Sequence, residues 1–162
     1  MISALAREWA SLLPGTDELG TDLLRRWSEP HRHYHDTGHL AAALTALGEL
    51  GGAARAERLA IWFHDAVHTG TTGPDEDASA DLAARSLAAA GLPAIEVAEV
   101  CRLVLVTVHH SPAPGDDAGA RVSDADLAVL GADPAAYAAS VAALRAESPL
   151  VPGARWRDAR LA

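Results

Sequence analysis

Apolar residues recur every three or four positions along almost the whole chain, and glycine or proline interrupts this pattern repeatedly. Such a period is typical of one face of an α-helix, whereas a half-buried strand alternates at every second residue. The pattern therefore predicts an all-α protein folded as a single compact helical bundle. Its breaks predict helices over these segments: 1–13, 16–29, 37–50, 53–68, 75–90, 93–110, 123–131 and 134–144, with a last turn within 152–161.

Two features indicate the core of this bundle. The apolar residues of segment 93–110 predict the most buried helix, and its β-prone run at 103–106 is interpreted as helix because the helical period continues on both sides. Trp9, Trp27 and Trp62 are expected in the core as well.

Length and composition limit the class of protein. A chain of 162 residues fits one domain, expected to span 1–162, with N-terminal helices over 1–28, a central part over 29–131 and C-terminal helices over 132–162. The single cysteine, Cys101, excludes an intramolecular disulfide framework and a cysteine-based zinc cluster.

Charge and hydropathy predict a cytoplasmic protein. Segment 1–13 carries Arg7 and Glu8 within its apolar pattern, which is typical of an amphipathic helix rather than a signal peptide. No stretch reaches the length of a membrane span. The net charge of -9 argues against nucleic acid polymers and acidic membranes as partners. We expect a small-molecule partner, and either a monomer or a homodimer.

The histidines are the most informative polar residues. All eight lie between His31 and His110, in a chain that contains no Lys, Asn or Gln. His35 and His39 are four residues apart, His64 and Asp65 are adjacent, and Asp126 follows in a later helix.

This spacing predicts a metal site between helices. His39 lies on the first turn of a predicted helix, and adjacent residues such as His64 and Asp65 project about 100° apart. Helical bundles build metal sites from side chains on facing helices. Nitrogen and oxygen donors together suit Mn, Fe, Co, Ni or Zn better than Ca or Cu(I). A water bound to such an ion can become a nucleophile near neutral pH.

These residues carry a resemblance to a known family. Tyr34-His35-x3-His39, His64-Asp65 and Asp126 resemble the HD superfamily of metal-dependent phosphohydrolases. Longer strings around them are similar to a group of small bacterial proteins described as predicted HD-type phosphohydrolases: residues 29–35, 62–67 and 124–131. The similarity extends over about residues 27–150, most of the chain.

The resemblance implies a phosphohydrolase that cleaves a phosphate mono- or diester, of a nucleotide or a related small molecule, with a metal-activated water. His35 would be the general acid, and Asp65 would be both catalytic and a ligand. A divalent ion (Mn, Fe, Co, Ni, Zn or Mg), or two ions, would be the cofactor. Its implied ligands are His39, His64, Asp65 and Asp126, and Asp124 is a rival for the last of these.

The remaining polar residues suggest how substrate binds. With no Lys in the chain, Arg32 is the expected phosphate ligand. His109 and His110 are further candidates for phosphate or a second ion, or else they are helix-terminal residues favoured by the dipole. His68 lies four residues after His64 on the same predicted face and is expected to support the site or to pack. Segment 75–77 is expected to be a solvated helix start.

Two other functions remain open from the sequence. The additional histidines are compatible with a di-iron oxygenase or other non-phosphate metal chemistry on the same helical frame. A non-catalytic metal- or nucleotide-binding module is the third possibility.

Overall fold

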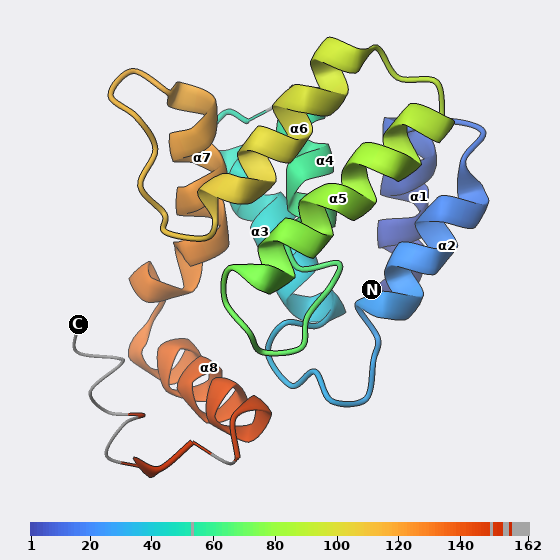
Figure 1. The fold of residues 1–162 in the computed structure, drawn as a ribbon. Helices are drawn as coiled ribbons and strands as arrows, with labels where there is room; N and C mark the ends of the chain where they lie inside the picture. The colour runs from blue at the N-terminus through green and yellow to red at the C-terminus, as the bar shows by residue number, and fades with distance from the viewer. Residues whose placement is uncertain (53, 150, 154–155, 157–162) are drawn as a thin grey trace.

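The computed structural model describes residues 1–52, 54–149, 151–153 and 156. Within them the chain forms eight α-helices and one 3₁₀ helix and no strand, which confirms the all-α fold (Figure 1). The last turn expected within 152–161 falls largely outside the described residues. In chain order the elements are α1 (Ile2–Leu12), α2 (Asp17–Arg26), α3 (Thr37–Glu49), α4 (Arg55–Phe63), α5 (Pro74–Ala89), α6 (Ala94–Val106), α7 (Asp117–Asp126), η1 (Leu127–Gly131) and α8 (Pro134–Glu147).

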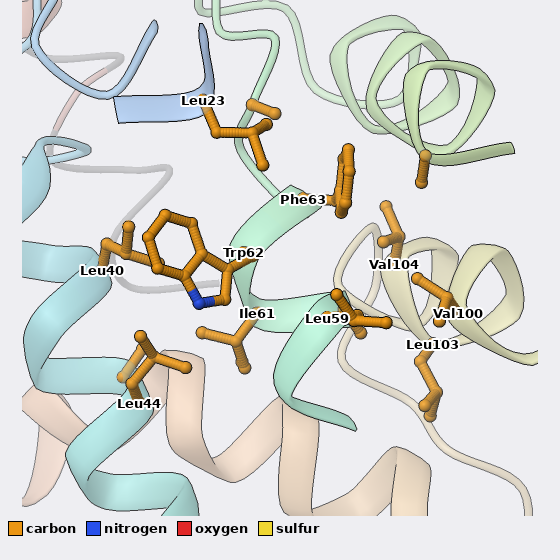
Figure 2. Packing of buried hydrophobic residues seen from close by; sticks show 14 of the residues in the cluster. Leu23, Leu40, Leu44, Leu59, Ile61, Trp62, Phe63, Val100, Leu103 and Val104 are labelled. Carbon is orange, nitrogen blue, oxygen red and sulfur yellow. The ribbon is translucent and has the colours of Figure 1, made fainter. Parts of the chain in front are cut away.

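Helix α4 lies at the centre and packs against α1, α3, α5, α6 and α7. Residues 59–63 are all fully buried, because a helix surrounded on every side has no face for solvent. Figure 2 shows Trp62 turned toward Leu40 of α3 and Leu59 turned toward Leu103 of α6. The most buried helix is therefore α4 and not the predicted 93–110, where Leu105 of α6 is 41% exposed.

The predicted tryptophans form part of the core, as expected. Trp9, Trp27 and Trp62 are each at most 1% exposed. Their indole N–H groups are satisfied: Trp9 donates to the Thr16 carbonyl at 3.0 Å, and Trp27 donates to the Trp62 carbonyl at 3.0 Å. The second bond joins the chain after α2 to the central helix, close to the residues of the candidate site.

Helices α4 and α6 end at least four residues earlier than the apolar period predicts. Helix α4 ends at Phe63 rather than residue 68, and α6 ends at Val106 rather than residue 110. In the turn after α4 the Val67 N–H donates to Ser79 Oγ of α5 at 3.0 Å, so it is not available to extend α4. His64 and Asp65 consequently lie in the turn that follows α4, next to the C-terminal end of this central helix.

Helix α7 begins earlier than predicted, at Asp117 instead of residue 123. The Asp116 carboxylate caps it by accepting the Gly119 N–H at 3.0 Å. This extension places Asp126 at the last turn of a three-turn helix that packs against both α3 and α4.

Helix α8 lies at the edge of the bundle, next to η1 (Figure 1). Ser140 is the one buried residue among the described residues of this helix. Among the described residues no single helix is long and apolar enough to cross a membrane, and α7 with η1 and α8 reaches the required length only across a bend of 106°.

Candidate metal centre

Three of the predicted site residues, His39, His64 and Asp126, converge on one point between α3, α4 and α7, and Asp65 lies beside His64. His39 Nε2 lies 2.9 Å from Asp126 Oδ1 and 3.2 Å from His64 Nε2. His64 Nε2 lies 3.2 Å from Asp65 Oδ2 and 3.4 Å from Asp126 Oδ1. Both imidazoles are almost completely buried, and the two carboxylates are about one-seventh exposed. The structure thus brings three of the four expected ligands together as one group, and it places Asp65 next to His64.

The start of α3 fixes the position of His39. The Asp36 carboxylate accepts the main-chain N–H groups of Gly38 at 2.7 Å and His39 at 3.2 Å, as an N-cap residue does. A Cβ at position 38 would lie 2.9 Å from Asp36 Oδ1, so glycine permits the close approach of the cap. The capped first turn then directs the His39 ring into the bundle, as predicted.

The hydrogen-bond partner of His64 Nδ1 determines the tautomer of this ring. His64 Nδ1 lies 2.8 Å from the carbonyl oxygen of Ile61, which can only accept a hydrogen bond. Nδ1 therefore carries the proton, and Nε2 presents a lone pair to His39, Asp65 and Asp126. This is the arrangement found for histidines that ligate a metal.

The spacing of the donor atoms fits one small divalent ion. Bonds of about 2.0–2.2 Å to nitrogen and oxygen place neighbouring ligand atoms about 3.0–3.5 Å apart. The separations of 2.9–3.4 Å in this cluster agree with that spacing. The residues present could therefore hold such an ion.

The charges of the cluster also favour a bound cation. Burial alone would lower the pKa of His64, but the facing carboxylates of Asp65 and Asp126 outweigh it and raise that pKa well above its usual value. Burial also raises the pKa of Asp126, and His64 and His39 outweigh it, so this carboxyl stays ionised. Two buried carboxylates thus need positive charge beside them, which an ion or protonated histidines would supply.

His35 lies beside this cluster but is not part of it. Its Nε2 is 3.9 Å from Asp65 Oδ2, and its Nδ1 is 2.6 Å from Glu147 Oε2. His68 Nε2 lies 3.4 Å from the same Glu147 oxygen. Burial lowers the pKa of His35, and the Glu147 and Asp65 carboxylates outweigh it and raise that pKa.

Glu147, at the last position of α8, was not predicted. Its Oε1 accepts the main-chain N–H groups of His33 at 2.7 Å, Tyr34 at 2.7 Å and His35 at 2.9 Å. Burial raises the pKa of Glu147, and the bonds from His35, His68 and the main chain outweigh it, so the pKa lies far below its usual range. In the sequence it is a single glutamate in an alanine-rich helix 112 residues after His35, and no local signal distinguishes it from a solvated one.

Arg32, the expected phosphate ligand, does not face the site. Its side chain is fully buried, and it donates to the Glu29 carboxylate and to the carbonyl oxygens of His35, Asp65 and Ala66. These bonds join the segment before α3 to the turn after α4. Its placement supports a structural role and gives no support to phosphate binding, because its donors point at main-chain oxygens.

The structure distinguishes between the two candidate aspartates of α7 and between the two candidate histidines after α6. Asp126 belongs to the cluster, whereas Asp124 is exposed on α7. His110 Nε2 lies 3.6 Å from Asp126 Oδ2, and its Nδ1 lies 3.2 Å from Ser123 Oγ. His110 takes a left-handed backbone conformation with φ of 49°, which turns its ring toward Asp126, while His109 is exposed. Of the two histidines, His110 is therefore the one beside the site.

The segment expected to be a solvated helix start is instead partly buried. Asp75 is 6% exposed, and its carboxylate accepts the N–H groups of Thr69 and Thr71 at 2.8 Å and the Thr69 hydroxyl at 2.7 Å. Asp77 is exposed, as predicted. Asp75 thus organises the loop over residues 69–73, and this loop faces the candidate site.

A cavity of about 460 Å³ opens beside Asp65. His35, His68 and Glu147 line it together with residues of the loop that Asp75 organises. The described residues that line it include no arginine. A second cavity of about 320 Å³ lies on the other side of the cluster, against His39 and Asp126.

Comparisons of this chain with family models, with curated proteins and with solved structures found no match. A function for the chain is therefore inferred from the geometry of this site and from the resemblance of its short motifs to the HD superfamily.

Proposed function

We propose that the protein is a metal-dependent phosphohydrolase that cleaves a phosphate mono- or diester of a small molecule such as a nucleotide. One observation carries the proposal: His39 Nε2, His64 Nε2 and Asp126 Oδ1 lie 2.9–3.4 Å from one another, with Asp65 Oδ2 3.2 Å from His64 Nε2 at the edge of an open cavity. Burying two carboxylates costs free energy unless positive charge lies beside them, and a bound ion would supply that charge.

His39, His64, Asp65 and Asp126 would hold the ion. When bound there, it would lower the pKa of a water molecule and draw negative charge from a phosphate oxygen. The ring nitrogens of His39 and His64 offer lone pairs only in the unprotonated state, so ion binding displaces protons from the cluster.

His35 would supply the proton to the leaving oxygen. Its Nε2 is directed toward Asp65 at the edge of the cavity, so a phosphate ester held by the ion would bring its leaving group close to this ring. A positioned general acid accelerates such a step by about 10²–10⁴-fold.

The cavity limits the substrate. A volume of about 460 Å³ is the size of a small-molecule pocket. Threonines of the loop and the acidic side chains of Asp75 and Glu76 also line the cavity, so the phosphate charge would be met by the ion and the histidines, in place of the Arg32 expected from sequence. Polar, uncharged or cationic leaving groups suit this lining best.

A second candidate function is non-phosphate chemistry at two ions, such as a di-iron oxygenase. His35, His68 and Glu147 form a second group of possible ligands next to the first. This function predicts two ions per chain and oxygen consumption by iron-loaded protein, without hydrolysis of any phosphate ester.

Metal analysis of the purified protein, followed by assays of p-nitrophenyl phosphate and bis(p-nitrophenyl) phosphate with Mn, Co, Ni, Mg, Fe and Zn, tests the proposal. We expect at least one bound ion and turnover of one ester by wild type, and loss of both in His64→Ala. A His64→Ala protein that keeps its metal and its activity would contradict the assignment.

A further inference from the structure

The Glu147 carboxylate makes two different sets of contacts with its two oxygens. Oε1 accepts three successive main-chain N–H groups, and Oε2 lies 2.6 Å from His35 Nδ1. We infer that Glu147 is a positioning residue, which holds the His35 ring so that its Nε2 faces Asp65 and the cavity. The inference rests on the proposed role of His35 as the proton donor.

Main-chain N–H groups hold the Glu147 carboxylate itself in one orientation. Its side chain is 6% exposed, and the N–H groups of His33, Tyr34 and His35 surround Oε1 at 2.7–2.9 Å. Rotation of the carboxylate would break all of these bonds at once. Oε2 is therefore presented to the ring in one orientation, although α8 is otherwise the least buried of the helices around the site.

This contact determines which ring nitrogen carries the proton. An ionised carboxylate can only accept, so the hydrogen of a neutral His35 lies on Nδ1. Nε2, on the opposite side of the ring, is then free to take up a proton and to deliver it. Nε2 lies 3.9 Å from Asp65 Oδ2, on the edge of the candidate metal centre. A carboxylate that orients a histidine in this way is common to many enzymes that transfer protons.

Hydrogen bonding explains the contact better than metal ligation does. Two ligands of one ion with bonds of about 2.1 Å lie about 3.0 Å or more apart. His35 Nδ1 and Glu147 Oε2 are 2.6 Å apart, which is the length of a hydrogen bond to a carboxylate.

Glu147→Gln tests the inference. The amide oxygen can still accept the main-chain N–H groups, but the amide NH₂ would face His35 Nδ1 and cannot accept its hydrogen. The matched control is Glu49→Gln, at an exposed position at the end of α3. Thermal unfolding of both variants shows whether the fold is kept.

Two esters separate positioning from a general structural effect. Phenolate leaves poorly without a proton, whereas p-nitrophenolate leaves as the anion. In Glu147→Gln we expect kcat for phenyl phosphate to fall by about 10–100-fold, the usual cost of losing an orienting carboxylate, and kcat for p-nitrophenyl phosphate to change little. An equal loss for both esters would overturn the inference.

A second readout does not depend on turnover. In ¹⁵N-labelled, zinc-loaded protein at a pH where His35 is neutral, imidazole nitrogen shifts should show the hydrogen on Nδ1 in wild type and in Glu49→Gln. In Glu147→Gln the same nitrogen shifts should show that His35 Nδ1 no longer carries the hydrogen. A hydrogen on Nε2 in wild type, or a second bound ion that Glu147→Gln loses, would overturn the inference. The predicted shifts without hydrolysis of any ester would support the positioning of the ring and contradict the phosphohydrolase.

Discussion

The Nε2 atoms of His39 and His64 face each other at 3.2 Å in the interior of the bundle. His64 Nδ1 is hydrogen-bonded to the Ile61 carbonyl, so its Nε2 has no hydrogen of its own when the ring is neutral. The nearby carboxylate oxygens of Asp65 and Asp126 also lack hydrogens. A cation held by His39, His64 and Asp126 would satisfy these acceptors, and the first two predictions depend on that geometry.

A bound ion should stabilise the fold. At a free ion concentration of about 100 times Kd, binding adds about 2.7 kcal/mol to the free energy of unfolding. For a chain of this size we expect Tm to rise by about 5–10 °C on adding Mn²⁺ or Zn²⁺, measured by calorimetry. His109→Ala should show the same rise because His109 is exposed, and His64→Ala should show none. An equal rise in His64→Ala would place the ion elsewhere.

The two aspartates of α7 should behave differently. Asp126→Ala removes an atom that contacts both histidines, so bound metal and activity should fall by at least about 100-fold. Asp124→Ala, two residues earlier on the exposed face, should bind metal and turn over substrate as wild type does. Metal titration of both variants checks this. The reverse pattern would restore Asp124 as the ligand.

Loss of Arg32 should affect stability more than substrate binding. Arg32→Ala leaves the Glu29 carboxylate and the carbonyl oxygens of His35 and Asp65 without their donor. We expect the free energy of unfolding to fall by about 2–3 kcal/mol in urea denaturation. Arg25→Ala, at an exposed ion pair on α2, should cost much less than Arg32→Ala. Unchanged stability with a large rise in KM would instead indicate phosphate binding.

The contribution of Asp75 should depend on pH. Burial would raise its pKa, but the bonds from Thr71 and Thr69 outweigh it and lower that pKa. Because the folded pKa is depressed, the stabilisation is fully present above the ordinary aspartate pKa of about 4 and is lost as pH falls through the folded value.

Asp75→Asn should therefore lower the free energy of unfolding by about 1–3 kcal/mol at pH 7, and the difference from wild type should shrink below about pH 4. Urea denaturation over a pH series measures this. Asp77→Asn, exposed in the same first turn of α5, should change stability by only a few tenths of a kcal/mol at any pH. A cost at position 75 that does not vary with pH would show that the charge of Asp75 is not involved.

Much of the fold and of the candidate ligand set could be predicted from the sequence. Helical period and breaking residues are local signals, so the helices were expected in nearly their observed places. Helix ends were less predictable, because α4 ends at Phe63 and the chain just after it bonds to another helix, through Val67 and Ser79. The ligand set was predictable because His64 and Asp65 are adjacent and because the short strings around His39 and Asp126 resemble a known family.

Other parts of the site depend on contacts between residues far apart in the chain. Arg32 is adjacent to the site in sequence, yet its donors are taken up by carbonyl oxygens that the turn after α4 brings to it. Glu147 resembles a solvated glutamate until α8 lies beside residues 33–35.

Residue spacing along the chain was thus sufficient to predict the helices, and spacing together with a family resemblance predicted the candidate metal ligands, because both leave local patterns. Tertiary structure alone decided which carboxylate orients His35 and which arginine is structural. Such roles depend on which unpaired donors and acceptors meet in a buried interior, and the energetic need to pair them there leaves no periodic trace in the sequence.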